Sequence, residues 1–226
     1  MKNFINWFNS TTPYETKEIK YAPIRSAILH LYFESIHPFE DSNGRIGRAI
    51  AEKALLQTTI TELVTIKTRM NLGDPTLTDA EIARVTTAAP YNLDAWDGYA
   101  VEREKLYALL AGKNVVNLAG DTHNAWFTDL KDASGNKVGT EIATSSVSSP
   151  GFEGYLGLTT NEAIQGFQGA LEFLIDDLKY TDSSRRGYLK ARFTQSNVTA
   201  NWVFVDSISN ENYSVDASKE EVISIG

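Results

Sequence analysis

Apolar residues recur with helical spacing in several stretches of the chain, and this pattern predicts helices there. The predicted helices cover residues 21–35, 44–57, 77–88, 93–110 and 161–178. Local signals support the prediction, because Thr78 and Glu81 have the spacing of a capping box and Gly112 follows the end of one helical pattern. Residues 1–20 show no sustained period, so we expect them to form a loosely ordered lead-in.

Shorter stretches are continuously apolar or alternate between apolar and polar residues, as β-strands do. The expected strands cover residues 115–119, which we interpret as buried, residues 138–144 in the same sheet, and a hairpin formed by residues 187–193 and 198–208. Residues 62–70 alternate in a way that suits either a strand or a linker. The polar tail beyond Asn210 is expected to be frayed.

One candidate site follows the predicted strand at residues 115–119. Gly120 ends the apolar run, so Asp121 and His123 emerge at the carboxyl end of the strand, where open α/β sheets bind ligands. A carboxylate two residues from an imidazole can supply two ligands to one metal ion. The alternative is an ordinary turn in which Asp121 caps backbone amides, because two ligands do not make a metal site.

A second candidate site is the segment HPFEDSNGRIGR, residues 37–48, which joins two predicted helices. A helix amino terminus offers unpaired amides and the positive end of a dipole, which favour an anion. Arg45 and Arg48 would hold phosphate oxygens there. The carboxylate of Asp41, or of the residue before it, would bind magnesium, and His37 would accept a hydroxyl proton. The alternative is a solvated helix–loop–helix whose charges only cap and pair.

Composition narrows the possible functions. The 226 residues are 42% apolar, enough for a packed core, and the formal net charge of -8 argues against non-specific nucleic-acid binding. There is no cysteine, so a thiolate metal site is excluded. We see no apolar run long enough to span a bilayer and no signal peptide, so we expect the chain as written to stay in the cytoplasm.

The amino-terminal part of the chain resembles the Fic family over roughly residues 20–57. Its segment HPFEDSNGRIGR is similar to the family signature HxFx(D/E)GNGRxxR, although Ser42 replaces the usual glycine. In that family the histidine deprotonates a target hydroxyl, the acidic residue binds magnesium, and the remaining motif residues hold the phosphates of ATP during AMP transfer. The resemblance implies these roles for His37, Asp41, Asn43, Gly44, Arg45 and Arg48.

The rest of the chain resembles the carboxy-terminal half of PhoD-type alkaline phosphatases, which hydrolyse phosphate monoesters and diesters. The similarity extends over about residues 62–210 and rests on four blocks in the right order: DAWDGYAVEREKLYALL, NVVNLAGDTHNAWFTDL, VGTEIATSSVSSPG and RRGYLKARFTQSNVTANWVFVDSI. It implies a metallophosphoesterase-like α/β sandwich with iron and calcium at its site. The GDxH segment would supply Asp121 and His123 as metal ligands, and Asn124 would orient the cluster or the substrate.

Together the two resemblances imply an α/β (α+β) protein with a Fic-like helical fragment at residues 1–57 and a PhoD-like portion at residues 58–226. In PhoD-type enzymes the first half of the chain supplies the remaining ligands, and the Fic helices and flap that complete the nucleotide pocket are absent here. Glu141, on the next predicted strand, is a weaker candidate ligand. We therefore expect the phosphoesterase site to be catalytically incomplete.

Three functions stay open at this point: a PhoD-like phosphoesterase, a Fic-type AMP transferase and a non-catalytic fusion remnant. The expected small-molecule partners are a phosphate ester or a nucleotide. We also expect self-association through an uncovered sheet edge, because unpaired strand edges present free backbone amides and carbonyls. PhoD relatives are typically exported, which contrasts with the cytoplasmic location expected from this sequence.

Overall fold

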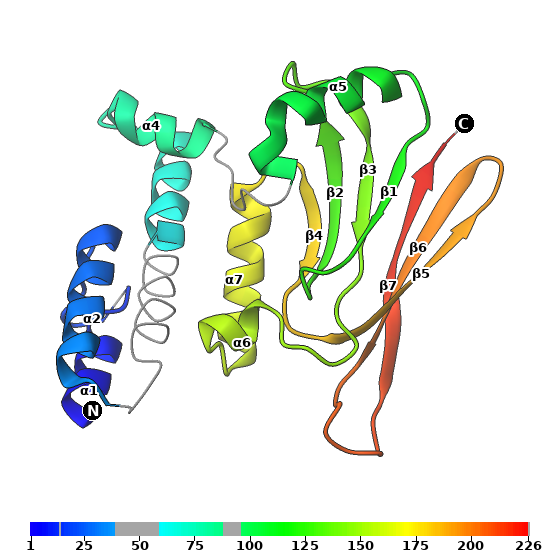
Figure 1. Ribbon diagram of the computed structural model, residues 1–226. Coiled ribbons are helices and arrows are strands. Elements are labelled where there is room, and N and C mark those ends of the chain that lie inside the picture. Colours follow the sequence, from blue (N-terminus) through cyan, green and yellow to red (C-terminus); the bar gives the residue numbers. More distant parts are fainter. Residues whose placement is uncertain (14, 39–58, 88–95, 226) are drawn as a thin grey trace. The chain divides into compact units, whose positions relative to one another are not determined.

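The computed structural model describes the chain except for residues 14, 39–58, 88–95 and 226 (Figure 1). The chain forms two compact units, Met1–Thr87 and Ala88–Gly226. The first unit contains α1 (Lys2–Ser10), α2 (Ala22–Ile36), a helix over residues 59–71 and α4 (Asp79–Thr86). The predicted helix at residues 44–57 lies outside the described residues.

Helix α1 corrects the expectation of a loosely ordered lead-in. Phe4 is buried in a cluster with Leu29 and Phe33 of α2, and its ring centroid lies 5.6 Å from that of Phe33. The helical pattern of Phe4, Trp7 and Phe8 extends over little more than one turn, too short to be recognised as a sustained period. Such a short helix is stabilised by packing against its neighbour rather than by intrinsic propensity.

Helix α2 matches the prediction and carries a buried arginine. Arg25 donates from Nε to Thr11 Oγ1 at 3.4 Å and from Nη2 to the Phe8 carbonyl at 3.2 Å. Its guanidinium also lies over the Phe8 ring, 5.0 Å from the centroid. A buried charge needs such partners, so Arg25 holds the end of α1 and the residue after it, Thr11, against α2.

The helix over residues 59–71 corrects the strand or linker predicted for residues 62–70. The β-branched residues are accommodated because Thr65 and Thr68 donate their hydroxyls to the carbonyls of Thr61 and Val64, four residues earlier. The capping box at the start of α4 is confirmed, since Thr78 Oγ1 accepts from Glu81 N while Glu81 accepts from Thr78 N. Two ion pairs join the helix over residues 59–71 to α4, Glu62–Arg84 at 2.6 Å and Arg69–Glu81 at 3.2 Å, and these tertiary contacts favour the helix over a strand.

The second unit contains two sheets and several helices. In chain order its elements are η1 (Trp96–Tyr99), α5 (Ala100–Leu110), β1 (Val116–Ala119), β2 (Ala125–Lys131), β3 (Lys137–Ala143), α6 (Phe152–Leu156), α7 (Asn161–Leu174), β4 (Leu178–Asp182), β5 (Arg186–Phe193), β6 (Asn197–Val205) and β7 (Val215–Ser224). The four-stranded sheet has the order β1-β3-β2-β4, with β1 and β3 parallel, and the antiparallel three-stranded sheet has the order β5-β6-β7.

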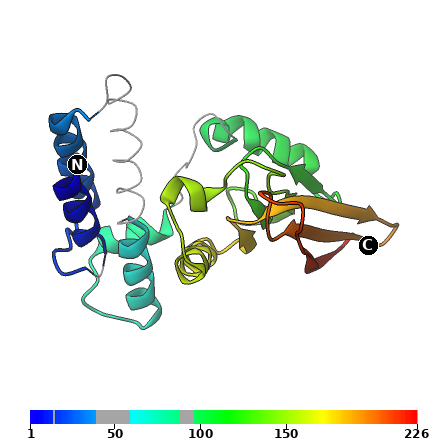
Figure 2. The same ribbon diagram turned by 90° about the horizontal axis from the view of Figure 1, so that it is seen from below.

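The described part of the helix predicted at residues 93–110 is the 3-10 helix η1 followed by α5, and three further details of this unit differ from the sequence prediction. Strand β1 is an edge strand rather than a buried one, and Leu118 is 58% exposed. Helix α7 ends at Leu174, because Leu178 already begins β4. The tail is not frayed, since Val215–Ser224 pairs with β6 as β7. Its end lies beside the tip of the β5–β6 hairpin, where the Ile225 amide donates to the Ser196 carbonyl at 2.9 Å (Figure 2).

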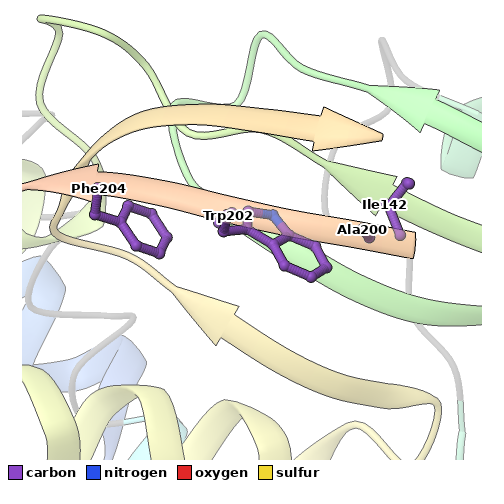
Figure 3. Close-up of a cluster of buried hydrophobic side chains, with 5 residues drawn as sticks. Ile142, Ala200, Trp202 and Phe204 are labelled. Atoms are coloured by element: carbon purple, nitrogen blue, oxygen red, sulfur yellow. The ribbon is translucent and has the colours of Figure 1, made fainter. Parts of the chain in front are cut away.

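The two sheets of this unit pack face to face around one buried cluster. Ala125 and Ile142 come from the first sheet, and Ala200, Trp202 and Phe204 come from β6 of the second (Figure 3). The Trp202 indole donates from Nε1 to the Ala143 carbonyl at 2.8 Å, so the only polar atom of this side chain is satisfied within the core. The unit is therefore an α/β sandwich, as expected for the fold class.

Replacing Trp202 tests this packing. We expect Trp202→Phe to lower the free energy of unfolding by about 1–3 kcal/mol, because it leaves the Ala143 carbonyl without its donor. Trp202→Ala should cost about 3–5 kcal/mol through the cavity it creates. Urea unfolding followed by circular dichroism measures both. The exposed Trp96 gives a matched control, and Trp96→Phe should stay within about 0.5 kcal/mol of the parent.

Candidate functional site

The candidate site lies at one edge of the four-stranded sheet. Strands β1 and β3 run parallel and end in register at Ala119 and Ala143, and the first residue of β2, Ala125, pairs with the last residue of β4, Asp182. The loops that leave these four strand ends therefore meet at the same edge. They include the GDTHN segment at residues 120–124.

The GDTHN segment forms a tight turn with unusual backbone geometry. Asp121 and His123 have φ angles of 69° and 61°, in the left-handed region that non-glycine residues seldom adopt. The Thr122 amide donates to the Gly120 carbonyl at 2.8 Å. Such conformations cost of the order of 1–3 kcal/mol each and concentrate at functional sites. Asp121 is exposed, and its carboxylate has no hydrogen-bond partner among the described residues.

His123 is oriented by the next loop. Its Nδ1 lies 3.1 Å from the carbonyl oxygen of Pro150, and because a carbonyl can only accept, Nδ1 must carry the proton. In the neutral imidazole this leaves the lone pair on Nε2. A metal-binding histidine usually donates its other N–H to a carbonyl or carboxylate in this way.

Asn124 forms hydrogen bonds with the backbone on both sides, in the loop that carries His123 and just after the loop that carries Pro150. It is fully buried, its Nδ2 donates to the Thr122 carbonyl at 2.5 Å, and its Oδ1 accepts from the Phe152 amide at 3.0 Å. Trp126 adds a further bond from its Nε1 to Thr122 Oγ1 at 2.9 Å. Both ends of the Asn124 amide thus hold backbone groups of the loops that carry His123 and Pro150.

The donor set at this edge is partial. Asp121 and His123 offer a carboxylate oxygen and an imidazole nitrogen, donor types that suit calcium and iron respectively. Glu141 is engaged elsewhere, since its Oε2 accepts from Asn117 Nδ2 at 2.6 Å. Within the described part of the chain, no group of three or more histidine or acidic side chains is placed to hold a metal ion. By donor chemistry, Asp121 and His123 suit two positions of a larger ligand set.

The second candidate site is placed only at its first residue. His37 follows the end of α2, is exposed and has a left-handed φ of 46°, while its amide donates to the Phe33 carbonyl. The other predicted residues lie outside the described residues: Asp41, Asn43, Gly44, Arg45 and Arg48. That His37 and these residues together form one site therefore stays a prediction.

Sequence reasoning missed several polar residues at the sheet edge. Glu153 of α6 and Arg186 of β5 form an ion pair 2.5 Å long, with both side chains mostly buried. Ser145 and Ser183, which follow β3 and β4, are buried and have hydroxyls without a partner among the described residues. No spacing rule links residues 33 positions apart, so the sequence offered no signal for the pair.

The fold and this site define an α/β protein with a candidate pair of metal ligands at a strand edge. A family model described as PhoD-like phosphatase matches residues 51–202, so the chain belongs to the PhoD-like phosphatase family. A second family model, Fic/DOC family, matches residues 1–55. The two resemblances seen in the sequence are thereby confirmed.

Two relatives show how much of such a protein this chain represents. Alkaline phosphatase D of Bacillus subtilis (strain 168) is 36% identical over 74 residues, which cover 29% of this chain and 13% of that protein. A solved structure of PhoD has 21% sequence identity and a TM-score of 0.48, and the similarity covers 60% of this chain and 26% of that one. The chain thus spans about a quarter or less of the length of these relatives.

Gly151 allows a test of how tightly the two site loops pack. A Cβ atom there would lie 2.5 Å from the Ser183 carbonyl oxygen and 2.6 Å from Asn124 Oδ1. We expect Gly151→Ala to lower the free energy of unfolding by about 1–3 kcal/mol, because backbone and buried amide must shift. Gly169→Ala in α7 is the control: its Cβ meets nothing within 4 Å, so stability should stay equal or rise by up to about 1 kcal/mol. Equal unfolding midpoints for the two variants would contradict the packing argument.

Proposed function

We propose that the second unit carries part of the site of a metal-dependent phosphoesterase acting on phosphate monoesters or diesters. Asp121 and His123 would be ligands of calcium or iron, and Asn124 would hold them in place. The observation that carries the proposal is the contact between His123 Nδ1 and the Pro150 carbonyl, which leaves Nε2 as the ring nitrogen able to bind a metal, two residues from Asp121 in the chain. Membership of the PhoD-like phosphatase family supports the substrate class.

The chemistry of this edge follows from its exposed carboxylate and its oriented imidazole. A bound metal would polarise a phosphoryl oxygen and lower the pKa of an attacking water. The chain's own contribution is to present one oxygen and one nitrogen from a constrained turn, with the His123 ring held by the Pro150 carbonyl. With two donors from the described residues, we expect weak metal binding and little turnover by the chain alone.

Metal titration tests the proposal. We expect calcium or manganese binding to the purified, chelator-treated chain, weakened at least about tenfold in Asp121→Asn and in His123→Asn. Calorimetry measures the affinity, and hydrolysis of an aryl phosphate diester measures turnover. Glu220→Gln, an exposed carboxylate on β7, is the matched control and should bind like the parent. Equal affinity in all four proteins would refute the ligand assignment, and rapid metal-dependent turnover would refute catalytic incompleteness.

A second candidate function is AMP transfer from ATP with magnesium by the first unit. The match of residues 1–55 to the Fic/DOC family model favours it, together with the HPFEDSNGRIGR segment. In this proposal His37 accepts the proton of a target hydroxyl, Asp41 binds magnesium, and Asn43, Gly44, Arg45 and Arg48 hold the phosphates.

Label transfer from ATP tests this candidate. We expect labelling of the chain or of added protein that falls at least about a hundredfold in His37→Ala, because a general base contributes that much or more. His30→Ala is the control, since His30 lies within α2, the helix that ends just before His37, and pairs with Glu34 at 3.6 Å. Labelling that persists in His37→Ala would exclude the family's mechanism, and absence of labelling in the parent would exclude the activity.

If neither assay gives a signal, the chain is the non-catalytic remnant. Self-association stays a prediction in each case: β1 and β4, like β5 and β7, are edge strands of their sheets within the described residues. Sedimentation of the same preparations measures it, and a sharp monomer would exclude it.

No helix of the described residues is long and apolar enough to cross a membrane. The compartment also stays a prediction.

A further inference from the structure

The Glu153–Arg186 ion pair joins two elements around the candidate site. Arg186 Nη2 lies 2.5 Å from Glu153 Oε1, and the side chains are 14% and 16% exposed. Arg186 Nη1 also donates to the Ser184 carbonyl, and the Glu153 amide donates to the Ser183 carbonyl at 3.3 Å. One guanidinium thus ties α6 to the turn between β4 and β5.

A nearly buried ion pair of this kind is a poor source of stability. Removing both charges from water costs about as much free energy as their attraction returns, so a well-packed apolar pair would often serve as well. Two atoms of the pair, Glu153 Oε2 and Arg186 Nε, also have no hydrogen-bond partner among the described residues. The pair is therefore better explained by the geometry that it imposes than by the stability that it adds.

The ion pair is linked to His123 through Gly151 and Pro150. The position of a Cβ on Gly151 lies 3.0 Å from Glu153 Oε2, 2.6 Å from Asn124 Oδ1 and 2.5 Å from the Ser183 carbonyl oxygen. Gly151 is thus enclosed between the carboxylate, the buried amide and the turn after β4. The residue before it, Pro150, presents the carbonyl that accepts from His123 Nδ1 at 3.1 Å.

We propose that Glu153 and Arg186 are positioning residues that hold the Pro150 carbonyl in place and so fix His123 in the Nδ1–H tautomer, which leaves the lone pair on Nε2. The role of Nε2 as a metal donor rests on the proposed function, whereas the tautomer is a property of the chain alone. Losing the pair removes the side-chain link between α6 and the β4–β5 turn and leaves the backbone bond from Glu153 to Ser183, so the Pro150 carbonyl selects one ring nitrogen less strictly.

The tautomer of His123 is the direct readout. Nitrogen chemical shifts of isotope-labelled histidine side chains distinguish the two neutral forms above the pH range in which histidine titrates. The chain has three histidines, so His123 is assigned by its loss in His123→Asn, and the other two serve as internal references. We expect the Nδ1–H form in the parent and a mixture of both forms in Arg186→Gln and Glu153→Gln. Arg186→Lys, which keeps the charge, should restore part of the parent signal.

Control variants separate this role from a general loss of structure. Lys131→Gln removes an ion pair of the same length, with Asp177, at the far end of β2 and should leave the His123 signal unchanged. Each variant is compared only where its circular dichroism matches the parent. A folded Arg186→Gln protein that keeps the parent tautomer would overturn the proposal. If Arg186→Gln does not fold, Glu153→Gln takes its place, because it preserves the side-chain volume and keeps one acceptor oxygen.

Manganese titration distinguishes the failure of this inference from failure of the proposed function. We expect affinity to fall about 10- to 100-fold in Arg186→Gln, as for other groups that orient metal ligands. If the tautomer shifts but the parent binds no manganese, the positioning role stands and the metal-site proposal fails. If the parent binds manganese and neither tautomer nor affinity changes in the variants, the positioning role fails.

Discussion

The second unit depends most on the packing of Trp202 between its two sheets, where the indole N–H is satisfied by the Ala143 carbonyl. This hydrogen bond crosses the space between the two sheets, and its acceptor is the last residue of β3. Burial of Trp202, Phe204, Ile142 and Ala125 around it supplies the hydrophobic free energy that holds the sheets together. Because Ala143 lies where β3 ends, the same bond fixes the strand edge from which the site loops emerge.

The loops at that edge are held by polar contacts as well as by apolar packing, in which the Phe152 ring contacts Trp126 and Phe167. Asn124 binds backbone groups of two loops, and the Glu153–Arg186 pair joins α6 to the turn after β4. Unsatisfied buried polar groups are costly, so these contacts restrict the loops to few arrangements. Asp121 and His123 have strained backbone conformations. A site built on such residues needs loops that are restricted in this way to keep its geometry.

The division of the chain into compact units differs from its division into family matches. The PhoD-like match begins at residue 51 and the Fic/DOC match ends at residue 55, whereas the first compact unit extends to Thr87. The helix over residues 59–71 and α4 thus carry PhoD-like sequence but fold with the first unit. Within it, Arg69 binds Asp74 at 2.8 Å and Glu81 at 3.2 Å, which joins that helix to α4.

The sequence by itself determined the features that depend on local chemistry. These include α2, the capping box of Thr78 and Glu81, the β5–β6 hairpin, and the emergence of Asp121 and His123 at a strand end, because periodicity, caps and turn residues act within a few positions. Only the tertiary structure decided that β1 is an edge strand, that residues 59–71 are helical and that residues 215–224 form β7. It also brought Pro150, Glu153 and Arg186 to His123 and Asn124. Contacts between residues far apart in the chain arise from packing and strand register, which no local pattern encodes.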